Sequence, residues 1–161
     1  YSESKTGGER LCKLYNDLYG VNTVSLRYFN VYGDRMPSEG SYAPVIGRFV
    51  KQKHRKEPLT IVGDGEQTRD FVSVKDVVNA NIVASTTDNE DCFGEPFNVG
   101  TNKSVSVNEV SFMVDGGKNG RSSLPERQEI IRSECDNNKI KSMMGWNPEC
   151  EISEFIEEVM V

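Results

Sequence analysis

The sequence predicts an α/β fold, in which helices and strands alternate along the chain. Residues 1–19 carry apolar side chains at the spacing of an amphipathic helix, and residues 23–29 are rich in β-branched and aromatic side chains, as strands are. Gly20 directly follows the last apolar residue of the first segment, where a helix C-terminal cap is expected. A helix joined to a strand by so short a loop indicates an α/β architecture.

The middle of the chain continues this alternation. A loop rich in Gly, Pro, Ser and Asp covers residues 33–43, and a short helix with one apolar face is expected after Pro44. Further strands are expected at 59–62, 70–74 and 97–99, and a further helix at 75–87.

The last third of the chain is predicted to be mostly helical. Residues 106–109 form a capping box, which predicts the start of a helix. The polar, Gly-rich stretch 115–128 is expected to be a loop. Asp136 is placed to cap a helix that runs through Met144, and the apolar spacing of residues 152–160 predicts a final amphipathic helix.

Charge and composition exclude several classes of protein. The chain has 19 Lys and Arg against 25 Asp and Glu, so its formal net charge is −6, and we expect no nucleic-acid partner. It has no run of about 18 apolar residues, so we expect no membrane span. Its first residues lack the basic and apolar segments of a signal peptide, and the missing initial Met suggests that a segment precedes Tyr1.

The four cysteines and the single histidine do not form a metal-binding pattern. Cys12, Cys92, Cys135 and Cys150 are scattered, with no C-x-x-C pair, so neither a zinc site nor a disulfide framework is expected. Reduced, buried or incidental thiols fit a cytoplasmic protein.

Tyr1 and Lys5 are the first candidates for chemistry. They form a Y-x-x-x-K pattern, whose spacing places both side chains on one face of the predicted first helix. An ammonium group beside a phenol stabilises the phenolate, which can take a proton from a substrate hydroxyl. The same pattern occurs by chance in many helices, so the motifs around it decide its meaning.

Five further motifs follow this pair in order. They are LRYFNVYG at 26–33, PLTI at 58–61, GDGEQTRDFV at 63–72, NVGT at 98–101 and GWNP at 145–148. As a set, they resemble the extended short-chain dehydrogenases that modify nucleotide sugars, and most of all the UDP-glucose and UDP-N-acetylglucosamine 4-epimerases. The resemblance extends over nearly the whole chain.

The resemblance implies the C-terminal part of a Rossmann-type enzyme with a small α/β substrate domain. Residues 1–32 would complete the NAD-binding Rossmann domain, and residues 33–161 would form mainly the nucleotide-sugar domain. The G-x-x-G-x-x-G loop that binds the dinucleotide pyrophosphate is absent from this sequence, as is the family's catalytic Ser or Thr. We therefore expect the isolated chain to be inactive.

The resemblance assigns the catalytic and cofactor-binding roles to three residues. Tyr1 would be the catalytic base, and Lys5 would stabilise its phenolate and hold the nicotinamide ribose of NAD. Tyr28 lies where the family places backbone contacts to the nicotinamide end of NAD.

The implied sugar-nucleotide site draws on several segments. Asn30 would hold the substrate near its diphosphate, and Arg69 would bind the diphosphate, since a planar guanidinium binds phosphate oxygens in pairs. An ion pair of Arg69 with Asp70 or Glu66 is the alternative. The segment that closes over the nucleotide includes Tyr42, Ala43 and Val45, and the strand whose backbone reads the uracil includes Leu59, Thr60 and Ile61.

A second substrate-binding cluster is implied near residue 128. Relatives carry Arg-x-Gly-Asp/Glu there, with the Arg on phosphate and the carboxylate on the ribose, whereas Arg127-Gln128-Glu129 is one residue shorter and lacks the Gly. Ser133 aligns with the residue that gates the sugar 2-substituent, and its small size implies room for a 2-acetamido group. A turn before the next helix is the alternative role for Ser133.

The implied reaction is NAD-dependent 4-epimerisation of a UDP-hexose through a 4-keto intermediate. A nucleotide-sugar 4,6-dehydratase or decarboxylase of the same family stays open, because its distinguishing residues would lie upstream. A non-catalytic fragment is the alternative from another class. Relatives often dimerise through the Y-x-x-x-K helix, so a homodimer is expected, with Leu14 and Leu18 serving either that contact or the core.

Overall fold

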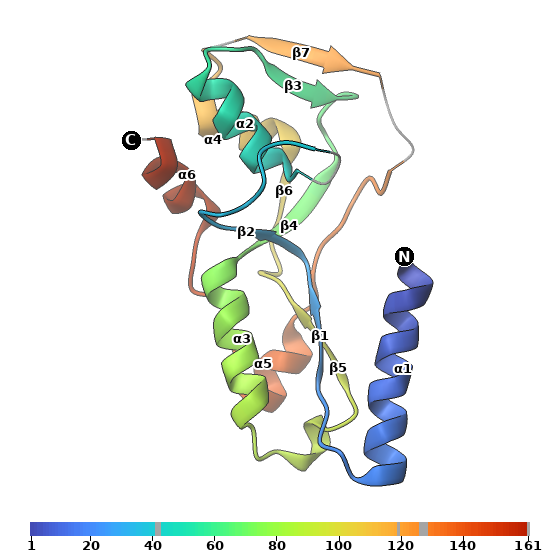
Figure 1. Cartoon of the computed structure of the whole chain (residues 1–161). Helices are drawn as coiled ribbons and strands as arrows, with labels where there is room; N and C mark the ends of the chain where they lie inside the picture. The colour runs from blue at the N-terminus through green and yellow to red at the C-terminus, as the bar shows by residue number, and fades with distance from the viewer. Residues whose placement is uncertain (41–42, 119, 126–128, 161) are drawn as a thin grey trace.

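Helices and strands alternate through most of the chain, which confirms the predicted α/β class (Figure 1). The computed structural model describes residues 1–40, 43–118, 120–125 and 129–160. In chain order the elements are α1 (Ser2–Tyr19), β1 (Ser25–Tyr28), β2 (Asn30–Tyr32), α2 (Val45–His54), β3 (Leu59–Val62), β4 (Thr68–Ser73), α3 (Val74–Thr86), the 3-10 turn η1 (Glu90–Cys92), β5 (Pro96–Val99), β6 (Ser104–Ser106), α4 (Val107–Asp115), β7 (Arg121–Leu124), α5 (Asn138–Met144) and α6 (Ile152–Met160).

Three small sheets connect the two ends of the molecule. β1 pairs in parallel with β5, β2 with β4, and β3 with β7, while β6 runs antiparallel to β4. In Figure 1 the β1–β5 pair lies at the lower end and the β3–β7 pair at the upper end, with the β2–β4–β6 sheet between them.

Two hydrophobic clusters form the core. The upper cluster of Figure 1 includes α2, α4, α6 and β3, and Ile46 and Phe49 are fully buried in it. The lower cluster includes α3, α5 and β5, with Phe97 and Trp146 buried. Leu26 of β1 packs against this lower cluster, which therefore takes residues from both sides of residue 32.

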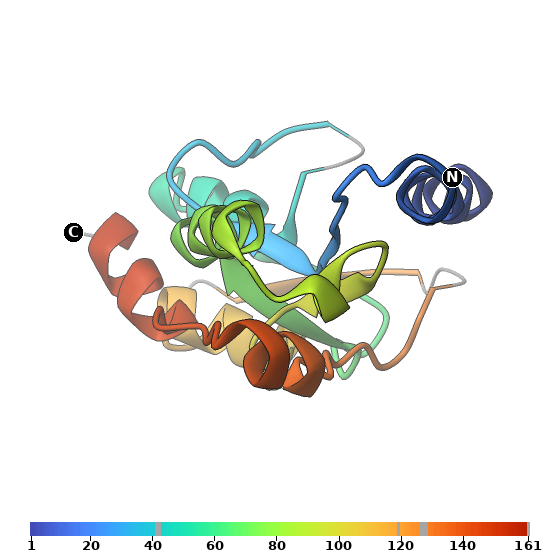
Figure 2. The ribbon, with the colours of Figure 1, turned by 90° about the horizontal axis from the view of Figure 1, so that it is seen from below.

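The helix α1 stands beside β1 and away from the rest of the chain (Figures 1 and 2). None of its 18 residues is buried, and Leu14 and Leu18 of its apolar stripe are 46% and 65% exposed. Its contacts with the following segment are polar, such as the ion pair between Glu9 and Arg27 at 2.6 Å. The predicted helix is therefore confirmed, but its apolar stripe is not part of the core. In the described part of the chain, no helix is long and apolar enough to cross a membrane.

Two predicted segments differ in the structure. The strand expected at 23–29 corresponds to β1, which pairs with β5, and a separate strand that was not expected, β2, follows at Asn30–Tyr32 and pairs with β4. The loop expected at 115–128 contains β7, whose four residues pair with β3. The sequence of β7, Arg-Ser-Ser-Leu, lacks strand periodicity and all four residues are exposed, so its conformation comes from pairing with the edge of β3.

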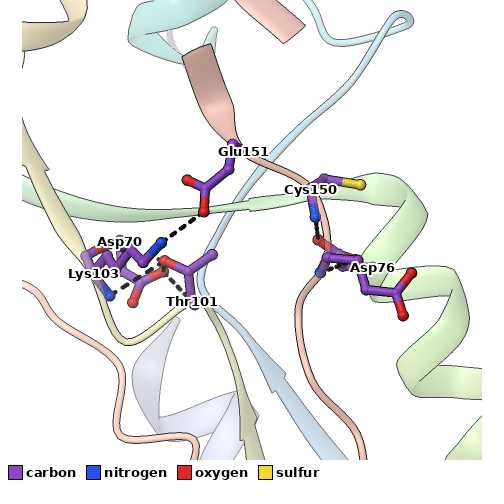
Figure 3. Close-up of polar contacts among 7 residues, drawn as sticks. Asp70, Asp76, Thr101, Lys103, Cys150 and Glu151 are labelled. Carbon is purple, nitrogen blue, oxygen red and sulfur yellow. Dashed lines mark hydrogen bonds and ion pairs between the residues drawn. The ribbon is translucent and has the colours of Figure 1, made fainter. Parts of the chain in front are cut away.

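Two buried aspartates fasten the loops to the sheet (Figure 3). Asp70 Oδ1 accepts hydrogen bonds from the N–H and the hydroxyl of Thr101 at 2.7 and 2.9 Å, and Asp70 Oδ2 accepts one from the Cys135 N–H at 3.1 Å. Asp76 accepts hydrogen bonds from the N–H groups of Glu149 and Cys150 at 3.0 and 3.2 Å. These carboxylates hold the segment after β7 against β4, and the segment between α5 and α6 against α3.

Candidate functional site

Most of the predicted substrate-binding residues meet in one pocket. The pocket has a volume of about 450 Å³, in the range of small-molecule sites. It lies among β2, β3, β4 and the first turn of α2. The predicted residues that line it are Asn30, Ala43, Val45, Thr60, Arg69 and Glu129.

Arg69 lies in the wall of this pocket and is already hydrogen-bonded. Its Nη2 lies 2.7 Å from Oε2 of Glu129, and its Nη1 donates to the backbone oxygen of Thr68 at 2.7 Å. The ion-pair partner is thus Glu129, not Asp70 or Glu66. Because the Arg69 side chain is only 19% exposed, these contacts hold its guanidinium in a fixed place.

Asn30 is fixed next to Arg69 by the pairing of β2 with β4. Its Nδ2 donates to the backbone oxygen of Asp70 at 2.9 Å, and its Cα lies opposite that of Phe71 in the parallel register. Two predicted diphosphate contacts, 39 positions apart in the sequence, therefore lie on adjacent strands.

Of the three β3 residues predicted to bind the uracil base, only one lines the pocket. Thr60 lines the pocket, whereas the side chains of Leu59 and Ile61 are buried in the upper cluster. The Thr60 N–H donates to Oε1 of Gln52 at 3.1 Å, and Gln52 Nε2 donates to the Thr60 hydroxyl at 2.6 Å. The Leu59 N–H donates to the backbone oxygen of Gly120 at 3.3 Å. A base that used either N–H would first have to displace its present partner.

The predicted catalytic pair lies on the first turn of α1, outside this pocket. Tyr1 is 95% exposed, and Lys5 Nζ lies 5.3 Å from the centre of its ring, so the two side chains share a face as predicted. The described part of the chain does not bring this pair to the pocket.

Tyr28 lies apart from both groups. Its hydroxyl donates to Oδ1 of Asn81 at 2.9 Å, and its side chain lines a second cavity of about 480 Å³ between β1 and α3. At this position the side chain is 46% exposed and therefore accessible to a ligand or another domain.

Three further predicted residues lie outside the pocket as described. Ser133 is half-buried next to β4, where its N–H donates to the backbone oxygen of Thr68 at 3.2 Å, and it does not line the pocket. Tyr42 and Arg127 fall outside the described residues.

Two polar residues of the pocket were missed from the sequence. Arg48 lines it from α2, and Gln67 lines it while donating to Oε1 of Glu129 at 3.3 Å. Helical spacing contained a signal for Arg48, since it lies three residues after Val45 and so on the same face of the helix.

Two of the four cysteines, Cys92 and Cys135, are buried. All four cysteines are free. Burial raises the pKa of Cys135 to about 12 and also raises the pKa of Cys92, so both thiols stay protonated near neutral pH. Among the described residues, no group of three or more His, Cys, Asp or Glu side chains is placed to hold a metal ion.

The chain is similar to several proteins named as nucleotide-sugar epimerases. A protein of Methanocaldococcus jannaschii, provisionally named a UDP-glucose 4-epimerase, is 40% identical over 99% of this chain and 52% of its own length. The solved UDP-glucose 4-epimerase of Thermotoga maritima with UDP-glucose is 32% identical, with a TM-score of 0.90, over 99% of this chain and 52% of that one. A third similar protein is the solved UDP-N-acetylglucosamine 4-epimerase of Methanobrevibacter ruminantium in complex with UDP-N-acetylmuramic acid. It is 30% identical, with a TM-score of 0.88, over 99% of this chain and 51% of that one.

The comparisons also identify the family. The chain spans about half the length of the curated relatives it matches. Residues 1–100 match the family model described as the NAD dependent epimerase/dehydratase family. Because this match covers more than half of the chain, and the Methanocaldococcus protein matches nearly all of it, the chain belongs to the NAD dependent epimerase/dehydratase family.

Proposed function

We propose that the whole protein catalyses the NAD-dependent 4-epimerisation of a UDP-hexose, and that this chain supplies the sugar-nucleotide pocket and the catalytic pair. The observation that supports this most is the pocket itself. It brings Asn30, Arg69 and Glu129 together with an apolar wall, as a nucleoside diphosphate with a ribose requires.

The proposed mechanism divides the work among residues of this chain. Arg69 and Asn30 hold the diphosphate, and Glu129 accepts hydrogen bonds from the ribose hydroxyls. The Tyr1 phenolate takes the proton from the sugar 4-hydroxyl and returns it to the 4-keto sugar after the sugar has turned over, while Lys5 stabilises the phenolate. NAD, when bound, supplies the hydride acceptor and donor at C4.

The exposed surface of the chain fits a shared NAD site. Tyr1 and Lys5 lie at the free end of α1, and Tyr28 is accessible at the end of β1, so the three can face a cofactor held by a second domain. The chain's own sequence has no pyrophosphate-binding loop. We propose that the other half of the relatives' length supplies this loop.

The exposed apolar faces favour further packing partners. We propose that the stripe of α1, including Leu14 and Leu18, forms a homodimer contact. Val74, Val78 and Ile82, which lie on one face of α3 and are 43–55% exposed, would pack on the NAD-binding domain. Free thiols fit the proposed cytoplasmic location.

Product analysis tests the reaction. The whole protein, incubated with NAD and UDP-glucose, is expected to form UDP-galactose. Formation of a 4-keto-6-deoxy sugar from UDP-glucose or dTDP-glucose, or loss of CO₂ from a UDP-uronate, would identify a dehydratase or a decarboxylase instead. The absence of any turnover by the whole protein would favour a binding module.

Arg69→Ala should weaken UDP-sugar binding by about 1.5–3 kcal/mol, the range for a hydrogen bond to a charged group. NAD binding to the whole protein should change far less, because no NAD contact is assigned to Arg69. Titration calorimetry with each ligand measures the two effects. Equal losses for both ligands would mean that Arg69 serves the fold and not the diphosphate.

Ser133→Tyr should abolish activity on UDP-N-acetylglucosamine and leave activity on UDP-glucose. A Tyr beside the sugar C2 substituent would overfill the space of the acetamido group, at a cost of about 1–3 kcal/mol or more. The ratio of kcat/KM for the two substrates, before and after the substitution, is the measurement. If the ratio stays the same, Ser133 is a turn residue and not the gate.

A further inference from the structure

The pocket contains two guanidinium groups but only one carboxylate among its described lining residues. These are Arg48 and Arg69 against Glu129. Arg69 is paired with Glu129 at 2.7 Å. Arg48 has no ion pair or side-chain hydrogen bond with any residue in the described ranges. In a chain with a net charge of −6, the unbalanced positive charge of this pocket therefore belongs to Arg48.

The backbone that carries Arg48 is firmly held. Ile46 and Phe49, on either side of it in the sequence, are fully buried in the upper cluster. One turn further along α2, Gln52 forms the pair of hydrogen bonds with Thr60 that ties the helix to β3. Arg48 itself is half-buried, on the helix face that also carries Val45 to the pocket. The backbone at Arg48 is thus held at the wall of the pocket.

We propose that Arg48, to which the family resemblance gave no role, is an anion-binding residue of this pocket, and that together with Arg69 it makes the site selective for a diphosphate over a monophosphate. This inference rests on the proposed function, because it specifies how the same pocket recognises the charge of its ligand. A diphosphate spreads its charge over two phosphoryl groups, so cations from two elements that line the pocket, α2 and β4, can each bind one of them.

The ion pair in the pocket explains why one guanidinium is not enough. Glu129 and the Thr68 carbonyl already occupy two of the terminal donors of Arg69. An anion that binds Arg69 must therefore either share the guanidinium with Glu129 or displace the Glu129 carboxylate. Both make the binding free energy of the anion less favourable. Arg48 has no such competitor among the described residues, so it adds a contact to the second phosphoryl group without breaking an ion pair.

Titration calorimetry of the whole protein with UDP and with UMP tests the proposal. Arg48→Gln removes the charge and keeps a polar side chain of similar shape, and it should weaken UDP binding about 10-fold or more. UMP binding should fall less than about 3-fold. Arg48→Lys should restore part of the UDP affinity, because it restores the charge without the planar fork. Arg55→Gln, at the exposed C-cap of the same helix and outside the pocket, is the matched control and should leave both affinities unchanged.

Several outcomes would overturn the assignment. Equal losses for UDP and UMP in Arg48→Gln, or no loss for either, would show that Arg48 does not select the diphosphate. An effect confined to UDP-glucuronate, absent with UDP, would place Arg48 at a sugar carboxylate. Failure of the whole wild-type protein to bind UDP, with its fold intact by circular dichroism, would contradict the proposed function itself and is distinct from these results. If Arg48→Gln fails to fold, the affinities of Arg48→Lys and of the wild type for UDP and UMP are measured at increasing salt concentration instead. Equal salt dependence of UDP and UMP binding would contradict the proposal.

Discussion

Tyr1→Phe in the whole protein should lower kcat for the proposed epimerisation by at least about 10²-fold, because it removes the hydroxyl that we propose as the general base. The ring remains, so the affinity for UDP-glucose should change little. Steady-state kcat and the dissociation constant for UDP-glucose, measured on the same preparation, separate the two effects.

The same helix offers a matched control for this substitution. Tyr15 lies on α1, is 51% exposed and lines neither cavity described above, so Tyr15→Phe should leave kcat unchanged. Near-normal turnover in Tyr1→Phe would show that another group takes the 4-hydroxyl proton. A loss of similar size in both variants would mean that α1 tolerates no substitution, and the loss could not then be attributed to the base.

Asp70→Ala should lower the free energy of unfolding by about 3 kcal/mol or more. The substitution removes the acceptor of the Thr101 N–H and of the buried Cys135 N–H, and each buried group left unsatisfied costs about 1–3 kcal/mol. The Thr101 hydroxyl keeps the Lys103 backbone oxygen as an acceptor at 3.2 Å. For a chain of this size, 3 kcal/mol lowers Tm by about 6–12 °C. Thermal unfolding followed by circular dichroism measures the shift.

Asp88→Ala is the control for Asp70→Ala. Asp88 is exposed and forms no ion pair or side-chain hydrogen bond with the described residues, so its removal should change stability by less than about 0.5 kcal/mol. Similar Tm values for Asp70→Ala and wild type would mean that water or a shifted side chain satisfies the donors at Thr101 and Cys135, and that Asp70 does not fasten these loops.

The order of the elements could be predicted from the sequence because it depends on local signals. The C-terminal caps Gly20 and Gly145 both adopt the left-handed backbone conformation, and the capping box of Ser106 and Glu109 forms as expected. The Asp136 carboxylate accepts the Asn138 N–H at 3.0 Å at the start of α5. Each of these features depends on residues within a few positions of one another.

Features that depend on distant partners could not be predicted in the same way. β7 has no strand pattern and exists because the edge of β3 is available to it. Glu129 became the partner of Arg69 across 60 positions, although Asp70 and Glu66 are nearer in the sequence. The buried Asp70 carboxylate instead accepts hydrogen bonds from the N–H groups of Thr101 and Cys135. Its burial beside these backbone donors is why Asp70 does not pair with the Arg69 guanidinium.

Six of the residues that line the pocket were expected from the sequence, whereas a residue that supports its wall, Gln52, was not. The resemblance placed Asn30, Ala43, Val45, Thr60, Arg69 and Glu129 at one site, and all six line the same pocket. Their roles toward a ligand stay predictions. Gln52, which occupies the N–H of Thr60, gave no signal in the sequence, because a Gln in an amphipathic helix is ordinarily solvent-facing.

The sequence and the exposure of α1 affect how readily the proposed catalytic pair, Tyr1 and Lys5, loses its order. Gly7 and Gly8 lie in the helix interior after Lys5, where each costs about 1 kcal/mol relative to Ala, and no side chain or backbone from outside the neighbouring helix residues lies within 4 Å of where their Cβ atoms would be. With none of α1 buried, little opposes fraying of its first two turns. The backbone amides there therefore exchange their hydrogens with solvent through local opening, long before the two core clusters open. Association with a surface that covers α1 would slow this exchange, and the proposed general base, Tyr1, would then become ordered.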